Sequence, residues 1–570
     1  MVTMSSPALD LFQHFWSWRL RRTPEFATFV GVKDYNSVLE AITEQRYQED
    51  YDTCCNFLQN ARELLKSTNS PSDKENLEFF VSEVSTFTEG HQHGGFYFPL
   101  NYMEGLHVDF VRLAEWATPS TLQDYQDIVT RYLGFSQQAE QVREIMRAGS
   151  RKGLTVHSVS VKGVAEECLR QADEPAEQSA FYSPFSSLDC GAEEEIKELQ
   201  SRALAAIKDS VQVGLRLLGD FLQAEYEALC RPEIAATSLP GGQEFYAACL
   251  KFHTTTDLTA QQIHEMGHKE VNRIETEMKD IIKELGHNVS LKQFIEDLRV
   301  DKSNFFTSKE ELLAAGKEIV FDKIYPRLTK LFTNVPRTKL EVNETPSSEY
   351  PAAFYLAGTE DGSRPGKYSL NTFKFSSQPR YEMISLSLHE ACPGHHLQGS
   401  YLLEKPGVAR FRKAMEDRNY FQSPSRFPFY TAYGEGWALY CETLGTELGL
   451  YEDPLDRFGH LSEDIFRACR LVVDTGMHAL GWSMEQAVDY MLDHSAASRE
   501  NVEGEVRRYV TWPGQAVGYK VGQIKILQLR EMAEKEMGDR FNIKTFHDIV
   551  LDCAGPLDIL ETKIREYMQT

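Results

Sequence analysis

The chain has 570 residues, of which 42% are hydrophobic and 25% charged, ordinary globular values that exclude wholesale disorder. Its 85 acidic and 60 basic side chains give a formal net charge of −25, which opposes binding to phosphate backbones and to anionic membrane surfaces. No apolar run approaches the roughly 18 residues needed to cross a bilayer. We therefore expect neither a nucleic-acid partner nor a membrane partner.

The start of the chain does not have the order of a secretory signal. Asp10, Gln13 and His14 interrupt its only apolar stretch, and basic residues follow this stretch instead of preceding it. The 10 cysteines are few for this length, and none belongs to a C-x-x-C pair. This usage is typical of reduced thiols, so we expect a cytoplasmic protein. Nothing in the sequence indicates an oligomeric state.

Helical periodicity dominates the chain and predicts a mostly α-helical fold. Apolar side chains recur at spacings of three and four in eight stretches: 36–66, 119–148, 192–230, 259–285, 308–333, 436–449, 456–478 and 515–537. Asp257 or Thr259 is expected to cap the helix that begins near Ala260. We expect more than half of the residues to be helical.

One region has the pattern of strands. The short segments Leu340–Asn343, Ala352–Leu356 and Lys367–Thr372 contain β-branched or aromatic residues and are separated by Gly and Pro. The glycine-rich segment 358–366 is typical of a turn between two strands. We expect one small β-sheet near residues 340–373, with strand content below about 12%, against a usual quarter.

The chain is expected to have two parts, which could form one fused body. Residues 1–235 would be an N-terminal helical part that forms one wall of a groove, and residues 236–570 a catalytic part. The polar segment 171–195 is the best linker candidate, although it could equally be a surface loop within one domain.

Two histidine motifs compete for a metal site. The first, His264-Glu-Met-Gly-His268, matches His-Glu-x-x-His, in which two histidines on one helix face share a zinc ion and the glutamate activates water. Its neighbours are mostly polar or charged, which predicts a solvated amphipathic helix. Since a catalytic zinc ion needs a dry, shaped cavity, we favour the second motif.

The second motif is His389-Glu-Ala-Cys-Pro-Gly-His395-His396, after an uncharged segment typical of a buried helix. The proline and glycine predict a bulge or kink. In a straight helix His395 would lie about 600° around from His389, on another face. An excursion of two residues at Cys392–Gly394 would return His395 to the direction of a ligand. We favour His395 as the second ligand and retain His396 as the alternative.

Glu435 is the candidate third ligand. It opens an otherwise apolar helix between small residues, where burying an unpaired carboxylate would be costly, and a bound metal would explain it. Glu442 lies seven residues further on the same helix face and is expected to orient a ligand histidine. The alternative is that Glu435 is a helix-start carboxylate favoured by the helix dipole.

Three motifs together resemble the family called domain of unknown function 885. They are the segment from His389 to Gln398, the segment from Glu435 to Glu442, and Arg508-Tyr509 followed by Pro513-Gly-Gln515-Ala and Tyr519-Lys520. The resemblance covers most of the chain and is firmest from about residue 240. The family is similar to the gluzincin metallopeptidases, which implies a helical fold with an active-site groove and one zinc ion per chain, held by two histidines and one glutamate.

The resemblance also implies catalytic roles. Zinc would be bound by His389, His395 and Glu435 with a fourth position for water, and Glu390 would be the general base. Arg508-Tyr509 is similar to the Arg-Tyr pair that supplies a transition-state phenol in angiotensin-converting-enzyme-like peptidases. Tyr519 is the second candidate for this phenol.

Substrate contacts are expected from the same region and from the predicted hairpin. Arg508 and Lys520 are candidates for holding a substrate carboxylate, with ordinary surface charge as the alternative, and Gln515 is a further candidate. The hairpin 352–373 offers an edge strand on which an extended peptide could pair, with Asn371 and Arg364 as contacts.

The sequence therefore predicts a zinc-dependent metallopeptidase, a hydrolase that cleaves di- or short oligopeptides in the manner of a carboxypeptidase or dipeptidase. One alternative is a zinc hydrolase for a non-peptide amide, since the same chemistry would serve. Another is an inactive metal-binding scaffold, against which the glutamate base and the two phenols argue. The scissile side chain and the native metal cannot be predicted from the sequence.

Overall fold

The computed structural model describes residues 6–345, 351–414 and 418–570, which divide into two compact units. Unit 1 consists of Met1–Ala248, Ala409–Pro428 and Val510–Trp512, and unit 2 consists of Cys249–Val408, Phe429–Tyr509 and Pro513–Thr570. Segment 171–195 lies inside unit 1, so it is not a linker between the units. A groove walled by residues 1–235 stays a prediction.

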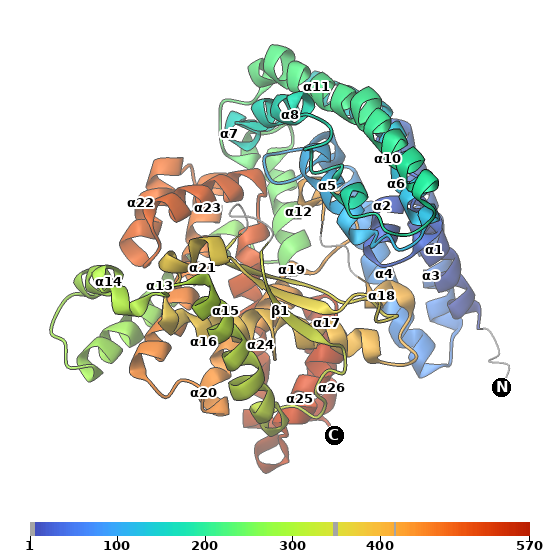
Figure 1. Ribbon diagram of the computed structural model, residues 1–570. Coiled ribbons are helices and arrows are strands. Elements are labelled where there is room, and N and C mark those ends of the chain that lie inside the picture. Colours follow the sequence, from blue (N-terminus) through green and yellow to red (C-terminus); the bar gives the residue numbers. More distant parts are fainter. Residues whose placement is uncertain (1–5, 346–350, 415–417) are drawn as a thin grey trace. The chain divides into compact units, whose positions relative to one another are not determined.

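Unit 1 is helical throughout (Figure 1). Its helices are α1 (Pro7–Arg22), α2 (Pro24–Phe29), α3 (Glu44–Ser67), α4 (Pro71–His91), α5 (Leu106–Trp116), α6 (Leu122–Arg151), α7 (Ser158–Val161), α8 (Val164–Asp173), α9 (Ser183–Ser186), α10 (Glu193–Ala206), α11 (Gln212–Phe221) and α18 (Arg410–Lys413). Helix α12 (Gly242–Thr254) begins in unit 1 and ends in unit 2.

The periodicity of 192–230 produces the core of unit 1. Two π-helical turns, η3 (Ile207–Val211) and η4 (Leu222–Tyr226), continue α10 and α11 into one long helical stretch. The apolar positions of this stretch pack against α6 and α8. Those that are fully buried are Leu199, Ile207, Val211, Leu215, Leu218 and Leu222.

Unit 2 contains the remaining helices and the sheet (Figure 1). The helices are α13 (Ala260–Glu284), α14 (Leu291–Val300), α15 (Lys309–Lys317), α16 (Met383–Glu390), α17 (His395–Glu404), α19 (Thr431–Thr443), α20 (Gly445–Leu448), α21 (Pro454–Ala479), α22 (Met484–His494), α23 (Arg499–Thr511), α24 (Gln515–Met537), α25 (Ile543–Cys553) and α26 (Leu557–Met568). The last residues of α23 are counted with unit 1. Thr259 caps α13 through a capping box with Gln262, which decides between the two predicted caps.

The sheet has three strands, β1 (Leu340–Glu344), β2 (Ala353–Leu356) and β3 (Gly366–Leu370), in the order β1-β3-β2. Strands β2 and β3 form the predicted antiparallel hairpin, and β1 pairs with β3 in parallel. Helix α15 packs against β1 and β3, and α16 packs against β2. Strand β2 is therefore an edge strand that lies beside the second histidine motif.

The predicted fold class is confirmed. Helices account for 71% of the residues, and the strands hold only five, four and five residues. Among the described residues, none of the helices combines the length and the apolar character needed to cross a bilayer.

Glycines allow α19 and α24 to pack closely at the centre of unit 2. A Cβ atom at Gly436 would lie 2.5 Å from the backbone of Gly522, and one at Gly518 would lie 2.7 Å from the side chain of Thr431. A Cβ atom at Gly522 would overlap the carbonyl oxygen of Ala432. Because the clashes at Gly436 and Gly522 involve backbone atoms, the two helix axes could not stay at their present separation with a larger residue at either position.

We expect Gly522→Ala to destabilise the protein by about 1–3 kcal/mol or more, since the added methyl group has no space between the two backbones. Gly504→Ala is the matched control, because Gly504 lies in α23 and a methyl group added there would have no other atom within 4 Å. Alanine is the better helix former, so the control should be neutral or slightly stabilised. Urea unfolding of both variants measures the difference, and equal midpoints would contradict the packing argument.

Candidate metal centre

The second histidine motif joins two helices through a widened turn. Helix α16 ends at Glu390, and α17 begins at His395. The amide of Gly394 donates to the carbonyl of Leu388 at 3.0 Å, six residues back instead of four. A Cβ atom at Gly394 would overlap the carbonyl oxygens of Leu388 and His389, so glycine is required here. The excursion predicted at Cys392–Gly394 is therefore present.

Helix α19 fixes this excursion in place. The indole Nε1 of Trp437, a fully buried side chain, donates to the carbonyl oxygen of Pro393 at 2.9 Å. Because Trp437 lies two residues after Glu435 on α19, the same helix positions the turn and the candidate third ligand. The prediction that Glu435 opens a helix is wrong, since α19 begins at Thr431. The neighbouring Gly436 serves the contact with α24.

The side chains of His389, His395 and Glu435 converge. Glu435 Oε2 lies 3.4 Å from His389 Nε2 and 3.5 Å from His395 Nε2, and one ligand atom from each of the three residues lies within 4.8 Å of the others. Bonds of about 2.0–2.2 Å to a tetrahedral zinc ion place ligand atoms about 3.3–3.5 Å apart. In the part of the chain that the structure describes, this is the only such group of three or more metal-ligating side chains.

Glu435 has the environment of a metal ligand. Its Oε2 atom is buried and has no hydrogen-bond partner among the described residues. Burial opposes the charge of this carboxylate, but the neighbouring His389 and His395 hold its pKa well below the usual range. The side chains of His395 and Glu435 are 20% and 21% exposed, so one side of the group is open to solvent. The donor set and its geometry therefore fit a zinc ion with an accessible position.

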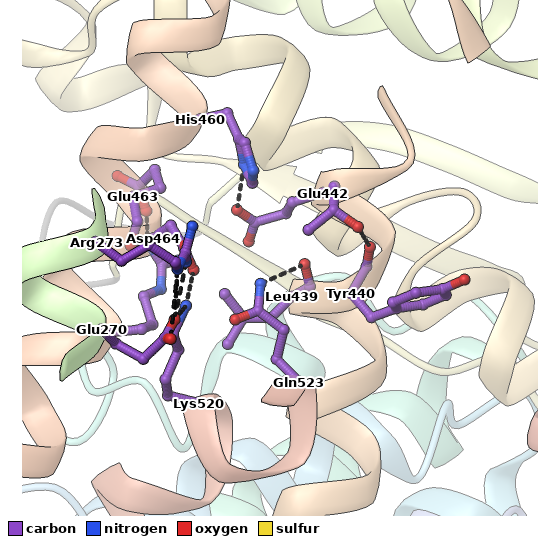
Figure 2. A network of polar contacts seen from close by, with 12 residues as sticks. Glu270, Arg273, Leu439, Tyr440, Glu442, His460, Glu463, Asp464, Lys520 and Gln523 are labelled. Carbon is purple, nitrogen blue, oxygen red and sulfur yellow. Dashed lines mark hydrogen bonds and ion pairs between the residues drawn. The ribbon is translucent and has the colours of Figure 1, made fainter. Parts of the chain in front are cut away.

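Glu442 orients His389 from the opposite side. Its Oε1 atom lies 2.8 Å from His389 Nδ1, and its Oε2 atom accepts a hydrogen bond from Ser385 at 2.8 Å. His460 Nδ1 lies 3.6 Å from the same Oε2 atom (Figure 2). Burial alone would lower the pKa of His389, but its contacts with Glu435 and Glu442 raise this pKa to about 10. A proton on Nδ1 directed at Glu442 leaves Nε2 to face the open side.

His396 lies outside the converging group. Its Nε2 atom is 3.2 Å from the carbonyl oxygen of Thr338, and its Nδ1 atom is 3.1 Å from the hydroxyl of Tyr355 on β2. A Cβ atom at Gly366 would lie 2.7 Å from this ring, so the first residue of β3 leaves space for the histidine. His396 thus anchors the start of α17 to the sheet, while the preceding His395 belongs to the converging group.

Glu390 is buried at the end of α16, directly after a ligand candidate. Burial raises the pKa of this carboxyl above its ordinary value, and the positive charges of His389 and His395 act against that shift. Arg467 on α21 also acts on Glu390 and on Glu442. A carboxylate with a raised pKa beside an open metal position is suited to accept and return a proton.

The two candidate phenols occupy different places. The hydroxyl of Tyr509 donates to Glu505 Oε2 at 2.7 Å and accepts from Arg470 Nε at 3.0 Å, and its side chain is 1% exposed. Tyr519 on α24 is partly exposed, and burial followed by the charge of Glu435 raises its pKa. Tyr519 is therefore the phenol that lies within electrostatic reach of the candidate metal centre.

Two of the predicted substrate contacts near the phenols are hydrogen-bonded to each other. Arg508 donates to Gln515 Oε1 at 3.1 Å and to Glu505 Oε2 at 3.0 Å. Gln515 is 3% exposed and begins α24, and a side-chain hydrogen bond connects it with Tyr519. Both residues thus lie in the neighbourhood of Tyr519.

Lys520 is placed in a buried ion-pair network and does not face the candidate metal centre as a free ammonium group. Its Nζ donates to Asp464 at 2.6 Å and lies 3.1 Å from Glu270, and its side chain is 1% exposed (Figure 2). Arg273 pairs with the same two carboxylates. This network joins α13, α21 and α24, so Lys520 is positioned to hold helices together rather than to grip a substrate.

Asn371 and Arg364, the predicted substrate contacts in the hairpin, are also buried. Asn371 follows β3 with no exposed surface, and its backbone amide donates to the carbonyl of Ala352 at 2.9 Å. Arg364 lies in the turn between β2 and β3, is 6% exposed, and donates from Nε to the carbonyl of Ala357 at 3.3 Å. Both are placed where they shape the hairpin, and neither belongs to the converging group.

Among the residues that the structure describes, the competing motif forms a pair of histidines with no third ligand. His264 Nε2 and His268 Nε2 lie 3.2 Å apart on α13, while Nδ1 of His264 contacts the carbonyl of Val472 at 3.1 Å. Tyr490 meets Nδ1 of His268 at 3.1 Å. Glu265, which would have to act as base, is exposed. Among the described residues no carboxylate or cysteine completes a three-ligand group with this pair.

Periodicity predicts the helix α21, but it did not identify the polar side chains of this helix that act on the candidate site. His460, Arg467 and Arg470 lie on α21, and they act on Glu442, on Glu390 and on Glu505, respectively. The available signal was a row of charged or polar residues at spacings of three and four in a largely buried helix: His460, Asp464, Arg467, Arg470 and Asp474.

Comparisons with known proteins agree on the fold. A crystal structure of a "putative lipoprotein" from Colwellia psychrerythraea is 25% identical, with a TM-score of 0.89 and coverage of 99% of both chains. A second structure, of a "putative lipoprotein of unknown function" from Shewanella oneidensis, is 17% identical, with a TM-score of 0.72 and coverage of 99% of this chain and 100% of the other. No curated protein matches. The family described as bacterial protein of unknown function (DUF885) matches residues 24–564, and the chain belongs to this family.

Proposed function

We propose that the protein is a zinc-dependent metallopeptidase of gluzincin type that hydrolyses short peptides. The observation that supports this most strongly is that ligand atoms of His389, His395 and Glu435 lie within 4.8 Å of one another. Glu435 Oε2 lies 3.4 and 3.5 Å from the two imidazole Nε2 atoms, which is the spacing of tetrahedral zinc ligands. Glu390 follows the first of these residues directly and is the only further carboxylate that we assign to the reaction. The proposal includes a cytoplasmic location and one zinc ion per chain.

The electrostatics of the site favour a cation. Glu390, Glu435 and Glu442 bring three buried carboxylates around two histidines, and burying negative charge without compensation is costly. A zinc ion held by His389, His395 and Glu435 would supply Lewis acidity, which polarises a carbonyl group and acidifies water. Glu442 would keep His389 in the tautomer that presents Nε2 as a ligand.

Glu390 is proposed as the proton carrier. Burial raises its pKa, which brings a carboxyl group closer to the range where it can accept a proton from water and return it to a leaving amine. The raised pKa is balanced by His389, His395 and Arg467, so the group stays able to ionise. Its position at the end of α16 is held by the widened turn that follows.

Tyr519 is proposed as the donor to the oxyanion that forms when the peptide carbonyl is attacked. Its phenol lies in the field of Glu435 and interacts with Arg508 and Gln515, and its side chain is partly exposed. The peptide itself could extend along the edge of β2, because Tyr355 of this strand packs 6.5 Å from the ring of His395.

Metal content distinguishes the two histidine motifs. We expect His389→Ala to lose the zinc equivalent that the unmodified protein binds, since removal of one of three ligands leaves too few donors. His264→Ala is the matched control and should keep a full equivalent. Elemental analysis after zinc loading and removal of free metal measures both. Loss of zinc in the His264 variant alone would indicate that the metal centre lies on α13 instead.

Glu390→Gln should retain zinc and lose activity toward peptides, with kcat reduced by roughly 10²–10⁴-fold or more, because the amide keeps the shape and cannot take a proton. Glu265→Gln is the control, since it changes the equivalent residue of the other motif. A mixed peptide library followed by mass spectrometry identifies a substrate, and steady-state rates then compare the variants. Full activity of Glu390→Gln would refute the mechanism.

Tyr519→Phe should lower kcat and kcat/KM together, by about 10²–10³-fold, because the lost hydrogen bond is made only in the transition state. In Tyr509→Phe the missing hydroxyl bonds Glu505 and Arg470, so kcat should change only a few-fold. The same steady-state assay compares the two variants. A larger kcat loss in Tyr509→Phe than in Tyr519→Phe would exchange the two roles.

A further inference from the structure

A second charged cluster lies next to Tyr519 and is built from three helices of unit 2. Arg470 on α21, Glu505 and Arg508 on α23 and Tyr519 on α24 are its members. Arg470 Nη2 and Arg508 Nη2 lie 2.9 and 3.0 Å from the same oxygen, Glu505 Oε2. One carboxylate therefore serves two guanidinium groups.

The charges of this cluster do not balance. The side chains of Arg470 and Arg508 are 9% and 15% exposed, and that of Glu505 is 20% exposed, so all three are largely withdrawn from water. Two positive charges against one negative charge leave an excess of one positive charge. Burying a charge without a partner of opposite sign is costly. An anion bound at this cluster would therefore stabilise the folded protein.

Both arginines also have an unused hydrogen-bond donor. Arg470 Nη1 and Arg508 Nε are buried and make no hydrogen bond with any residue that the structure describes. The other donors of Arg470 are used by Tyr509 and Glu505, and those of Arg508 by Glu505 and Gln515. Buried donors without acceptors are uncommon in folded proteins and indicate a missing partner.

Tyr519 connects this cluster with the candidate metal centre. The guanidinium carbon of Arg470 lies 4.5 Å from the centre of the Tyr519 ring, and Arg508 shares a side-chain hydrogen bond with the same residue. The charge of Glu435 acts on the phenol of Tyr519 as well. Tyr519 therefore interacts both with the arginine cluster and with a ligand candidate of the metal centre.

We propose that Arg470 and Arg508 form a subsite for the free C-terminal carboxylate of the substrate, so that the protein cleaves peptides close to their C-terminus. This inference rests on the proposed peptidase function and adds Arg470 as a binding residue. A carboxylate carries the single negative charge that the cluster lacks. It also offers two oxygens in a plane, the shape that guanidinium donors bind best. Glu505 and Tyr509 position the two arginines.

Binding to a zinc-loaded protein that does not turn over tests the subsite. The probes are a pool of tripeptides of mixed sequence with free C-termini and the same pool with amidated C-termini. Equilibrium dialysis against the Glu390→Gln protein, with mass spectrometry of the bound fraction, measures both. Free acids should bind at least about 10-fold more tightly than amides, since a charge-assisted hydrogen bond is lost in the amide.

Substitution of the arginines should remove this preference. Arg470→Gln and Arg508→Gln, each combined with Glu390→Gln, should weaken binding of the free acids by about 10- to 100-fold and leave the amides unchanged. Arg540→Gln is the matched control, because Arg540 is exposed. Zinc content and thermal unfolding verify that each variant is folded. If Arg470→Gln does not fold, the comparison of Arg508→Gln with Arg508→Lys still tests the subsite. The lysine variant should recover part of the affinity for free acids that the glutamine variant loses.

Hydrolysis by the unmodified protein separates this inference from the proposed function. Equal cleavage of free acids and amides would leave the peptidase proposal standing and overturn the carboxylate subsite. Equal binding of the two pools, or a preference that both arginine variants keep, would overturn it as well. A preference for free acids that depends on the arginines, without hydrolysis of either pool, would support the subsite and reject the peptidase proposal.

Discussion

The buried contact between His389 and Glu442 is the interaction on which the candidate metal centre depends. It connects α16 with α19 across 2.8 Å and determines which nitrogen of the imidazole faces Glu435. Removal of the carboxylate would leave the ring free to rotate or to change tautomer, and the three ligand atoms would no longer share one point. Ser385 and His460 hold the carboxylate from its other oxygen, so the contact is supported from α16 and α21.

The packing around this contact explains the glycines at four positions of unit 2. Gly394 allows the widened turn, Gly436 and Gly522 allow α19 to approach α24, and Gly366 leaves space for His396. In each case the obstacle to a larger residue is a backbone atom or a buried ring, which cannot move aside at low cost. These glycines thus allow the helices and the sheet to pack closely. This close packing in turn places the polar side chains of the site.

Helix α21 supplies polar side chains to three groups of buried residues. Toward its N-terminal half, Asp464 is neutralised by Lys520 and Arg273, and His460 contacts Glu442. One to two turns further, Arg467 acts on the carboxylates of the candidate metal centre. Arg470 then contributes to an excess of positive charge beside Tyr519.

The sequence by itself determined the fold class, the hairpin of β2 and β3, the helices within the eight periodic stretches, and the group formed by His389, His395 and Glu435. These features follow from local rules: periodicity, turn residues, and the effect of proline and glycine within one helix. The sequence did not determine that α19 begins at Thr431, that β1 pairs in parallel with β3, that Lys520 is buried against Asp464, or that Arg470 lies beside Tyr519. Each of these depends on which helices pack together, and charged residues carry no local signal of their partner. Only the tertiary structure decided whether a charge faces solvent, another charge or the candidate metal centre, because burial and pairing arise from contacts between distant segments.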